Sequence, residues 1–234
     1  MMPKILARDE KGKYGVEWEG QTLKLTSVTK VTDCAMKHAL LFFYGKHGTK
    51  KAREIAAEAA QIGTDTHVYC EAWFLKEKIV NTSGDIKKIR NCIANFKAFV
   101  KKFEPVPYTI DGEMCLEMTV FSISHLYAGT FDGLFRLNDG RLVLIDWKTS
   151  SGIWDDYYIQ IEAYYRALTE LAKRGIINLK DKVDALMIVR FDKDERFDVD
   201  EDVVTLEPGN ESRFNAFLGL NSYSKWKESA KELK

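Results

Sequence analysis

Asp132, Asp146 and Lys148 are the residues of this sequence whose types and spacing most clearly predict chemistry. Residues 142–145 form an apolar run, which is typical of a strand buried on both faces of a sheet. Asp146 and Lys148 follow this run two residues apart, so we expect their side chains on one face of the strand. Because burying a carboxylate or an ammonium is costly, the two groups must either pair with each other or bind an ion.

The turn before this strand decides where Asp132 lies. A three-residue loop over 138–140 places Asp132 opposite Asp146 on the same face, whereas a two-residue turn over 139–140 places it opposite Trp147 and separates the carboxylates. The sequence permits both turns. Two opposed carboxylates repel each other unless a cation lies between them, and ligand sets of oxygen, or of oxygen and imidazole, suit Mg²⁺ or Mn²⁺. The alternative is a surface Asp132 beside an Asp146–Lys148 ion pair.

The helices and strands that must position these residues follow from the hydrophobic pattern. In the first helical region, Gly63 is expected to end one helix and Thr64 to begin the next. This order of elements predicts an α/β fold in which a central mixed sheet is flanked by helices, in a single domain over 1–234. A mainly helical region over 27–104 comes first, and 192–234 hold an acidic segment and a C-terminal helix. We expect a hairpin over 14–25, helices within 32–78 and over 85–103, 154–174 and 213–233, and strands over 114–122, 128–137, 142–148, 183–191 and 197–206.

Four short motifs occur in order along the chain: Gly63-Thr-Asp-Thr-His67-Val-Tyr-Cys-Glu71, Gly129-Thr-Phe-Asp132, Ile145-Asp-Trp-Lys148-Thr and Gln160-Ile-Glu-Ala-Tyr164. This pattern resembles the PD-(D/E)XK nuclease superfamily, and most closely its RecB/Cas4-like branch, which includes the mitochondrial genome maintenance exonuclease. The resemblance extends over about residues 27–164. It implies a restriction-endonuclease-like core, with the catalytic part in residues 113–191, and hydrolysis of DNA.

The resemblance also implies a metal site. His67, Asp132 and Asp146 would bind Mg²⁺ or Mn²⁺, and the backbone carbonyl of Trp147 would complete the protein ligands. A cation suits phosphodiester hydrolysis, because it acidifies water and stabilises charge on the phosphate oxygens.

Four further residues receive roles from the same resemblance. Lys148 would orient or deprotonate the attacking water, and Gln160 would hold the active-site strand or that water. Tyr164 would pack against the site or contact the DNA backbone, and Glu117 would support a second metal. The residue before Asp132 is a phenylalanine where the superfamily pattern has proline, which this branch tolerates.

The cysteines predict neither a metal cluster nor a disulfide framework. None follows Cys115, so we expect no iron–sulfur cluster of the Cas4 type, and the spacing suits buried or idle thiols in a reducing compartment. The N-terminus has no apolar segment typical of a secretory signal, and no run of about 18 apolar residues predicts a membrane span. We expect an intracellular protein, cytoplasmic or in the host cytoplasm if viral, that is not secreted.

The net charge is zero, from 35 Lys+Arg and 35 Asp+Glu, but the charges are unevenly distributed. Residues 34–53 and 86–103 hold basic residues and no acids, whereas 192–211 hold nine acids and two bases. The basic stretches are predicted to contact phosphates beside the site, the alternative being solvated helix faces. The acidic stretch is expected to face away from DNA or to bind a partner protein. In the two basic stretches, the candidate DNA-binding side chains are Lys46, Lys50, Lys51, Arg53, Lys87 and Lys88.

Together these features predict an Mg²⁺- or Mn²⁺-dependent deoxyribonuclease. We favour an exonuclease that acts on single-stranded or free DNA ends in recombination, repair or phage DNA processing. The alternatives are a structure-specific endonuclease and a non-catalytic member of the same fold that binds DNA or a partner protein. The intact set of Asp132, Asp146, Lys148 and Gln160 argues against the non-catalytic alternative.

Overall fold

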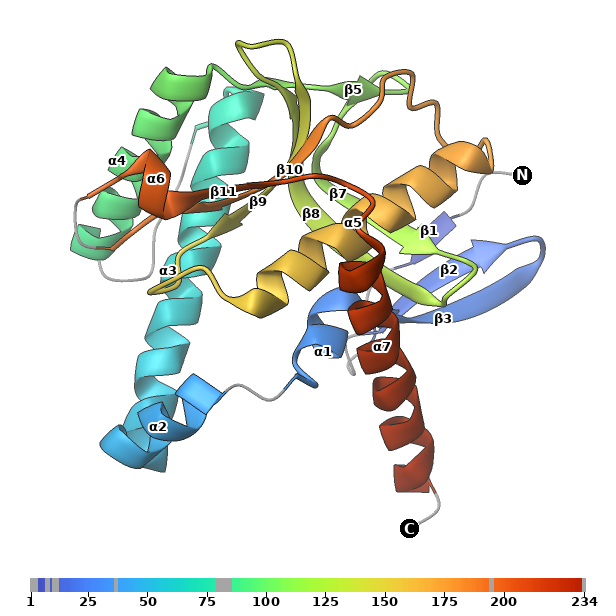
Figure 1. Cartoon of the computed structure of the whole chain (residues 1–234), viewed down its shortest axis with the longest axis horizontal. Helices are drawn as coiled ribbons and strands as arrows, with labels where there is room; N and C mark the ends of the chain where they lie inside the picture. Colours follow the sequence, from blue (N-terminus) through green and yellow to red (C-terminus); the bar gives the residue numbers. More distant parts are fainter. Residues whose placement is uncertain are drawn as a thin grey trace.

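The computed structural model describes residues 4–6, 9, 13–35, 38–78, 86–193 and 196–232. Within these residues, nine strands form one mixed sheet with the order β1-β2-β3-β8-β9-β10-β11, and β4 and β7 both pair with β8 (Figure 1). The expected central mixed sheet flanked by helices is confirmed. A separate short hairpin consists of β5 (Thr109–Ile110) and β6 (Glu113–Met114). The strands of the main sheet are β1 (Lys4–Leu6), β2 (Tyr14–Trp18), β3 (Gln21–Ser27), β4 (Val106–Pro107), β7 (Leu116–Ser122), β8 (Tyr127–Arg136), β9 (Leu142–Lys148), β10 (Ala185–Arg190) and β11 (Val203–Leu206).

Helices cover both faces of this sheet, and α3 and α4 lie on the opposite side from α5 and α7 (Figure 1). On β9, Leu144 packs in the core shared with α5, whereas Ile145 packs in the core shared with α3 and α4. The alternation explains why the sequence of this strand is apolar throughout, because both of its faces are buried. The helices are α1 (Val28–Thr32), α2 (His38–His47), α3 (Thr49–Leu75), α4 (Ile86–Phe103), α5 (Asp155–Lys173), α6 (Val199–Asp202) and α7 (Glu211–Glu232).

The expected break at Gly63 is wrong, because α3 continues through it as one helix of 27 residues. A β-carbon at Gly63 would lie 3.2 Å from Thr149 Oγ1, so the glycine lets the helix approach the end of β9 closely. Thr64 does not cap a new helix; its hydroxyl donates to the Ala60 carbonyl at 3.1 Å. The intrinsic penalty of glycine in a helix, about 1 kcal/mol, is therefore outweighed by tertiary packing.

The loop between β8 and β9 is the three-residue alternative. The Leu137 N–H donates to the Arg141 carbonyl at 3.0 Å, and Gly140 has a φ of +85°, in the left-handed region. Asp139 stabilises this loop, because its Oδ1 accepts from the Arg141 N–H at 3.0 Å and its Oδ2 from Arg141 Nε at 2.8 Å. The turn type sets the register of the two strands that carry the candidate site.

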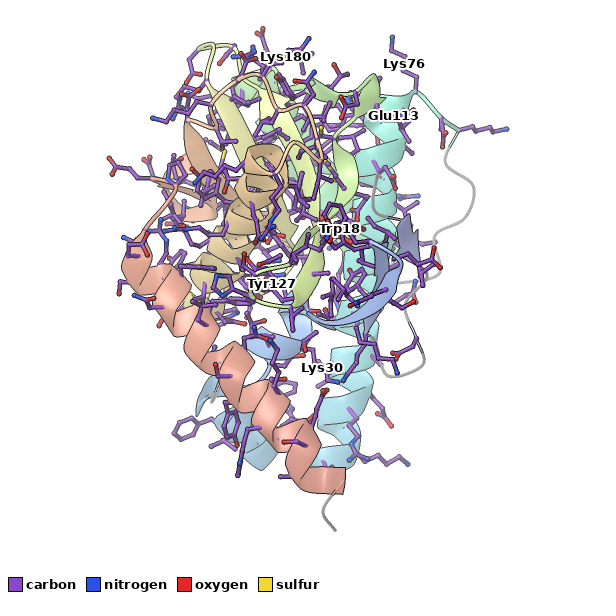
Figure 2. All side chains as sticks on the ribbon, turned by 90° about the vertical axis from the view of Figure 1, so that its right-hand side faces the viewer. Trp18, Lys30, Lys76, Glu113, Tyr127 and Lys180 are labelled. Carbon is purple, nitrogen blue, oxygen red and sulfur yellow. The ribbon has the colours of Figure 1, made fainter. Side chains whose placement is uncertain are left out.

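The C-terminal helix α7 is tied to the N-terminal part of the chain. Figure 2 shows α7 running diagonally past Lys30, which lies on α1. Lys30 Nζ contacts Glu228 Oε1 at 2.5 Å, and Lys13 Nζ contacts Glu228 Oε2 at 2.6 Å. The expected edge strand over 197–206 is confirmed only in its second half, since α6 precedes β11.

Two further findings concern the cysteines and the helices. The four cysteines are free thiols, and Cys70, Cys92 and Cys115 are buried. None of the helices in the described part of the chain combines the length and the apolar character needed to cross a membrane.

Candidate functional site

His67, Glu117 and Asp132 converge from three different elements. His67 lies on α3, Glu117 on β7 and Asp132 on β8, and one ligand atom from each lies within 4.8 Å of the others. His67 Nδ1 is 2.8 Å from Asp132 Oδ1 and 3.8 Å from Glu117 Oε1. The structure thus brings together three of the predicted site residues.

The backbone at Glu117 is unusual for a strand. Its φ is +44°, in the left-handed region, although its neighbours Leu116 and Met118 keep their pairing with Gly133 and Phe131 of β8. Such a conformation costs of the order of 1 kcal/mol or more for a residue other than glycine, and it persists only where surrounding structure imposes it. It occurs here at the residue whose carboxylate lies beside His67.

Asp132 is buried, and both of its oxygens are engaged. Oδ1 contacts His67, and Oδ2 accepts a hydrogen bond from the Trp147 N–H at 2.5 Å. The paired residues Gly133 and Ile145 continue the register that places Asp132 opposite Asp146. Burial is the main reason that the pKa of Asp132 is raised to about 6; the charge of Asp146 adds to the rise and that of His67 opposes it. The carboxylate therefore lies where a cation would be stabilising.

The imidazole of His67 partly supplies that cation. Burial lowers its pKa, but the charge and hydrogen bond of Asp132, together with a hydrogen bond to Glu117, outweigh burial and raise the pKa to about 10. In the structure as it stands, His67 is an imidazolium that neutralises part of the cluster. A metal ion bound there would take the place of this proton.

Asp146 and Lys148 form an ion pair at the end of β9. Asp146 Oδ2 is buried and makes no hydrogen bond beyond this contact. Burial acts to lower the pKa of Lys148, but the negative charges of Asp146 and Asp132 outweigh it and raise the pKa. The Lys148 ammonium also lies over the ring of Tyr157, 4.8 Å from its centroid. Asp146 is thus paired with lysine and lies outside the His67–Glu117–Asp132 cluster.

Gln160 and Tyr164 lie one turn apart on α5, and both are buried. Gln160 Nε2 donates to the Tyr164 hydroxyl at 2.7 Å. The Tyr164 ring packs on Gly129, where a β-carbon would come within 2.4 Å of Tyr164 Cε1. Burial, followed by the charge of Asp146, raises the pKa of Tyr164 well above its usual value. Tyr164 is only 2% exposed, so its side chain packs inside the fold, and its contact with the DNA backbone stays a prediction.

The predicted carbonyl ligand, Trp147, meets the site through its backbone N–H, and its carbonyl role stays a prediction. Its side chain packs on the opposite face of the sheet, with the Phe191 ring stacked at 5.3 Å. Two further residues near the site were not predicted from the sequence to take part in it. Tyr157 contacts Lys148, and burial, together with the charge of Glu117, raises the pKa of Glu71. Glu71 follows His67 by four residues, a helical spacing that the motif already contains.

The candidate DNA-binding residues lie on the helices of the N-terminal region, and their role stays a prediction. Arg53 precedes His67 by 14 residues in the unbroken α3, which corresponds to about 21 Å along the helix. Lys88 pairs with Glu58 at 2.6 Å, nine residues before His67. The distance arises because α3 does not break at Gly63. The remaining members of this predicted set, Lys46, Lys50, Lys51 and Lys87, lie on α2, the first turn of α3 and the first turn of α4.

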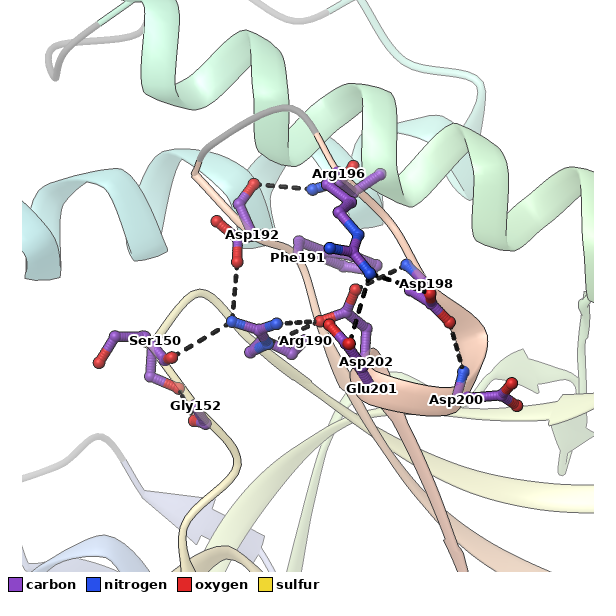
Figure 3. A network of polar contacts seen from close by, with 12 residues as sticks. Ser150, Gly152, Arg190, Phe191, Asp192, Arg196, Asp198, Asp200, Glu201 and Asp202 are labelled. Atoms are coloured by element: carbon purple, nitrogen blue, oxygen red, sulfur yellow. Dashed lines mark hydrogen bonds and ion pairs between the residues drawn. The ribbon is translucent and has the colours of Figure 1, made fainter.

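Acidic residues of the 192–211 segment form a network with two arginines (Figure 3). Arg190 donates to Asp202 Oδ1 through Nε at 2.7 Å and to Asp192 Oδ2 through Nη1 at 2.8 Å. Arg196 Nη2 lies 3.3 Å from both Asp198 Oδ2 and Glu201 Oε1. Four acids of this segment are thus used within the fold.

The donor set of His67, Glu117 and Asp132 fits a small divalent cation. An octahedral ion with bonds of about 2.1 Å places adjacent ligand atoms about 3 Å apart and opposite ones about 4.2 Å apart. The observed separations from His67 Nδ1, 2.8 Å and 3.8 Å, lie close to this range. Carboxylates suit Mg²⁺ and Mn²⁺, and an imidazole favours the softer of the two.

Comparisons with known proteins give distant structural likenesses only. Neither the family models nor the curated sequences compared with this chain give a match. A protein from Eubacterium rectale, provisionally named an exonuclease, is 14% identical with a TM-score of 0.44, over 87% of this chain and 79% of that one. An alkaline exonuclease from Laribacter hongkongensis is 13% identical with a TM-score of 0.37, over 90% and 95%. The structure of that exonuclease in complex with dAMP is 14% identical with a TM-score of 0.36, over 90% of this chain and 95% of that one. The function proposed below therefore rests on the residues of this chain.

Proposed function

We propose that this protein is a metal-dependent deoxyribonuclease of the PD-(D/E)XK type. The observation that carries the proposal is the convergence of His67, Glu117 and Asp132 within 4.8 Å, beside a strand that ends in Asp146 and Lys148. Three acids with one lysine and one imidazole leave the buried cluster with excess negative charge. A divalent cation relieves this excess, and it supplies the Lewis acidity that phosphodiester hydrolysis needs.

In this proposal His67, Glu117 and Asp132 hold the cation, and Asp146, which the strand register places opposite Asp132, shares it. Lys148, kept as a cation by Asp146, orients the attacking water and offsets charge that develops on the phosphate oxygens. Tyr164 fixes α5 against β8 through its contact with Gly129, on the strand that bears Asp132, and Gln160 holds the Tyr164 hydroxyl by a hydrogen bond within α5. If a second cation binds, Glu117 would hold it as well as the first.

The finer features of the proposal concern the substrate. We infer an exonuclease that acts on single-stranded or free DNA ends in recombination, repair or phage DNA processing. The basic side chains of α2 and the first turn of α3 support contact with a strand at a distance from the cut, since phosphate contacts need no sequence information. A structure-specific endonuclease is the alternative within the class, and the acidic segment 192–211 is a candidate surface for a partner protein.

Cleavage assays test the proposal directly. The wild type and Lys148→Ala are incubated with end-labelled single- and double-stranded DNA in Mg²⁺, Mn²⁺ or EDTA, with Lys180→Ala, an exposed lysine outside both basic stretches, as the control. We expect cleavage by the wild type and the control in metal, and loss of cleavage in EDTA and in Lys148→Ala. Closed circular DNA separates the subclasses, because an exonuclease leaves it intact. A wild type that binds DNA without cutting it would show a binding protein instead.

A further inference from the structure

We propose that Tyr157 is a positioning residue for Lys148, whose ammonium it holds against its ring face while Asp146 is engaged by a cation. The proposal deepens the nuclease function and rests on it. Among the residues that the structure describes, two contacts can direct the Lys148 ammonium, the Asp146 carboxylate and the Tyr157 ring at 4.8 Å. The Lys148 side chain is 15% exposed, so solvent contributes little to its orientation.

The two contacts differ in what happens when a cation binds. The Asp146 carboxylate is then shared between Lys148 and the cation, and its hold on the ammonium weakens. The Tyr157 ring has no competing partner of this kind, because an aromatic face does not bind a hard divalent cation in water. A desolvated cation–π contact is stronger than an exposed one, and the Lys148–Tyr157 contact is largely buried.

The backbone that carries Tyr157 is held by hydrogen bonds in the loop that follows Lys148. The Tyr157 N–H donates to the Trp154 carbonyl at 3.0 Å, in the first turn of α5. Ser150 Oγ donates to the Gly152 carbonyl at 2.7 Å, and Arg190 Nη1 donates to the Ser151 carbonyl at 3.2 Å (Figure 3). The chain between the lysine and the aromatic ring is thus held at three points.

Three variants of the full chain test the proposal. Tyr157→Leu removes the ring, Tyr157→Phe keeps it, and Tyr158→Leu is the matched control, because Tyr158 is a neighbouring half-buried tyrosine of α5 that packs against the same core. We expect Tyr157→Leu to lower kcat about tenfold with KM for DNA changed less than about twofold. Tyr157→Phe restores kcat to within about threefold of the wild type, and Tyr158→Leu leaves it near the wild-type value.

A second measurement needs no activity. In metal-free protein the ring current of Tyr157 shifts the Lys148 ε-methylene resonances upfield, and we expect this shift to be lost in Tyr157→Leu and kept in Tyr157→Phe. Wild-type kcat in Tyr157→Leu, an equal loss in Tyr157→Phe, or an equal loss in Tyr158→Leu overturns the proposal. If the wild type cuts no DNA, the nuclease function fails. The resonance shift then still decides whether the ring holds the lysine.

Discussion

Acidic side chains gather in two regions of this molecule, and the two are neutralised differently. In the network of Figure 3, the buried Asp202 accepts from both Nε and Nη2 of Arg190, and its other oxygen accepts from the Asp198 N–H at 2.8 Å. In the candidate site, the buried Asp132 faces a half-buried His67 and a second carboxylate. An arginine that binds a carboxylate through two nitrogens leaves it no need for another cation.

The difference teaches where a metal ion can bind. The oxygens of Asp202 are fully engaged by groups that cannot be displaced without breaking the fold around them. The raised pKa of Asp132, caused mainly by burial, means that ionising this carboxylate in the fold lowers the stability of the protein when no cation is present. Sites that sacrifice stability in this way are typical of function. The comparison predicts opposite responses to the same kind of substitution.

The largest effect is expected for Asp132→Asn on cleavage. The substitution removes a ligand charge from the cluster, and we expect the rate of DNA cleavage to fall by about 1000-fold, because the electrostatic contribution of a catalytic cation is worth several kcal/mol. Asp202→Asn is the matched control and should cleave at close to the wild-type rate at a temperature at which it is folded. Equal losses in the two variants would remove the distinction between the regions.

Stability should respond in the opposite order. Asp202→Asn removes the carboxylate that Arg190 contacts through two nitrogens, although Arg190 keeps Asp192 as a partner, and we expect the free energy of unfolding to fall by about 1.5–3 kcal/mol. Asp132→Asn in EDTA should lose less stability than Asp202→Asn, because relief of the repulsion from Asp146 offsets part of the loss of the charge pair with His67. Urea denaturation measures both, and Arg196→Ala, whose side chain is 69% exposed, should change stability by about 0.5 kcal/mol or less.

Metal addition should stabilise one region only. At a Mn²⁺ concentration about 100-fold above its dissociation constant, the wild type should gain about 2.7 kcal/mol, which raises Tm by roughly 5–10 °C. Asp202→Asn should show the same increase from its lower starting point, and Asp132→Asn should show little. A thermal melt with and without EDTA records the shift. An increase retained in Asp132→Asn would place the ion elsewhere.

The metal-free protein should also depend on pH through His67. Its pKa is about 10 in the fold, above the ordinary 6.5, so the contribution of His67 to stability is full below about pH 6.5 and is lost as pH rises through 10. In EDTA, we expect the urea midpoint of the wild type to fall between about pH 7 and pH 10 more steeply than that of His67→Gln. Identical slopes would show that Asp132 does not hold His67 as a cation.

The smallest effect is expected at Gly63, where α3 meets the end of β9. Gly63→Ala gains about 1 kcal/mol of helix propensity but brings a β-carbon to 3.2 Å from Thr149 Oγ1. We expect a net stability change within about 1 kcal/mol and a cleavage rate lowered about three- to tenfold, because Thr149 directly follows Lys148. Gly45→Ala is the control, since its added β-carbon would meet no other segment of the described chain within 4 Å. An unchanged rate in Gly63→Ala would show that the strand end tolerates displacement.

Much of the fold could be predicted from the sequence, because the pattern of apolar residues reflects burial directly. The run from Leu142 to Ile145 predicted a strand that is buried on both faces, and the structure confirms this. The break at Gly63 was wrong because helix propensity is local, whereas the contact with Thr149 is between segments far apart in the chain. For the same reason Arg53 was expected nearer to His67 than the unbroken α3 places it.

The residues of the candidate site could be predicted from the sequence, but the register of the two strands that carry Asp132 and Asp146 could not. Both turns between the strands accept an Asp-Gly pair, and the loop is decided by the hydrogen bonds of Asp139 to Arg141, which the sequence does not display. Likewise, the charge of residues 192–211 suggested a free acidic surface, but Arg190 lies just outside that stretch and neutralises part of it. The contact of Tyr157 with Lys148 joins a helix to a strand and has no local signal.

Calorimetric titration of Mn²⁺ into the metal-free protein tests most directly that the His67–Glu117–Asp132 cluster is a metal site. The wild type and Asp202→Asn should bind Mn²⁺ with equal stoichiometry and similar affinity, and Asp132→Asn should lose the tightest site. Binding that survives unchanged in Asp132→Asn, or that disappears in Asp202→Asn while that variant is folded, would contradict the assignment.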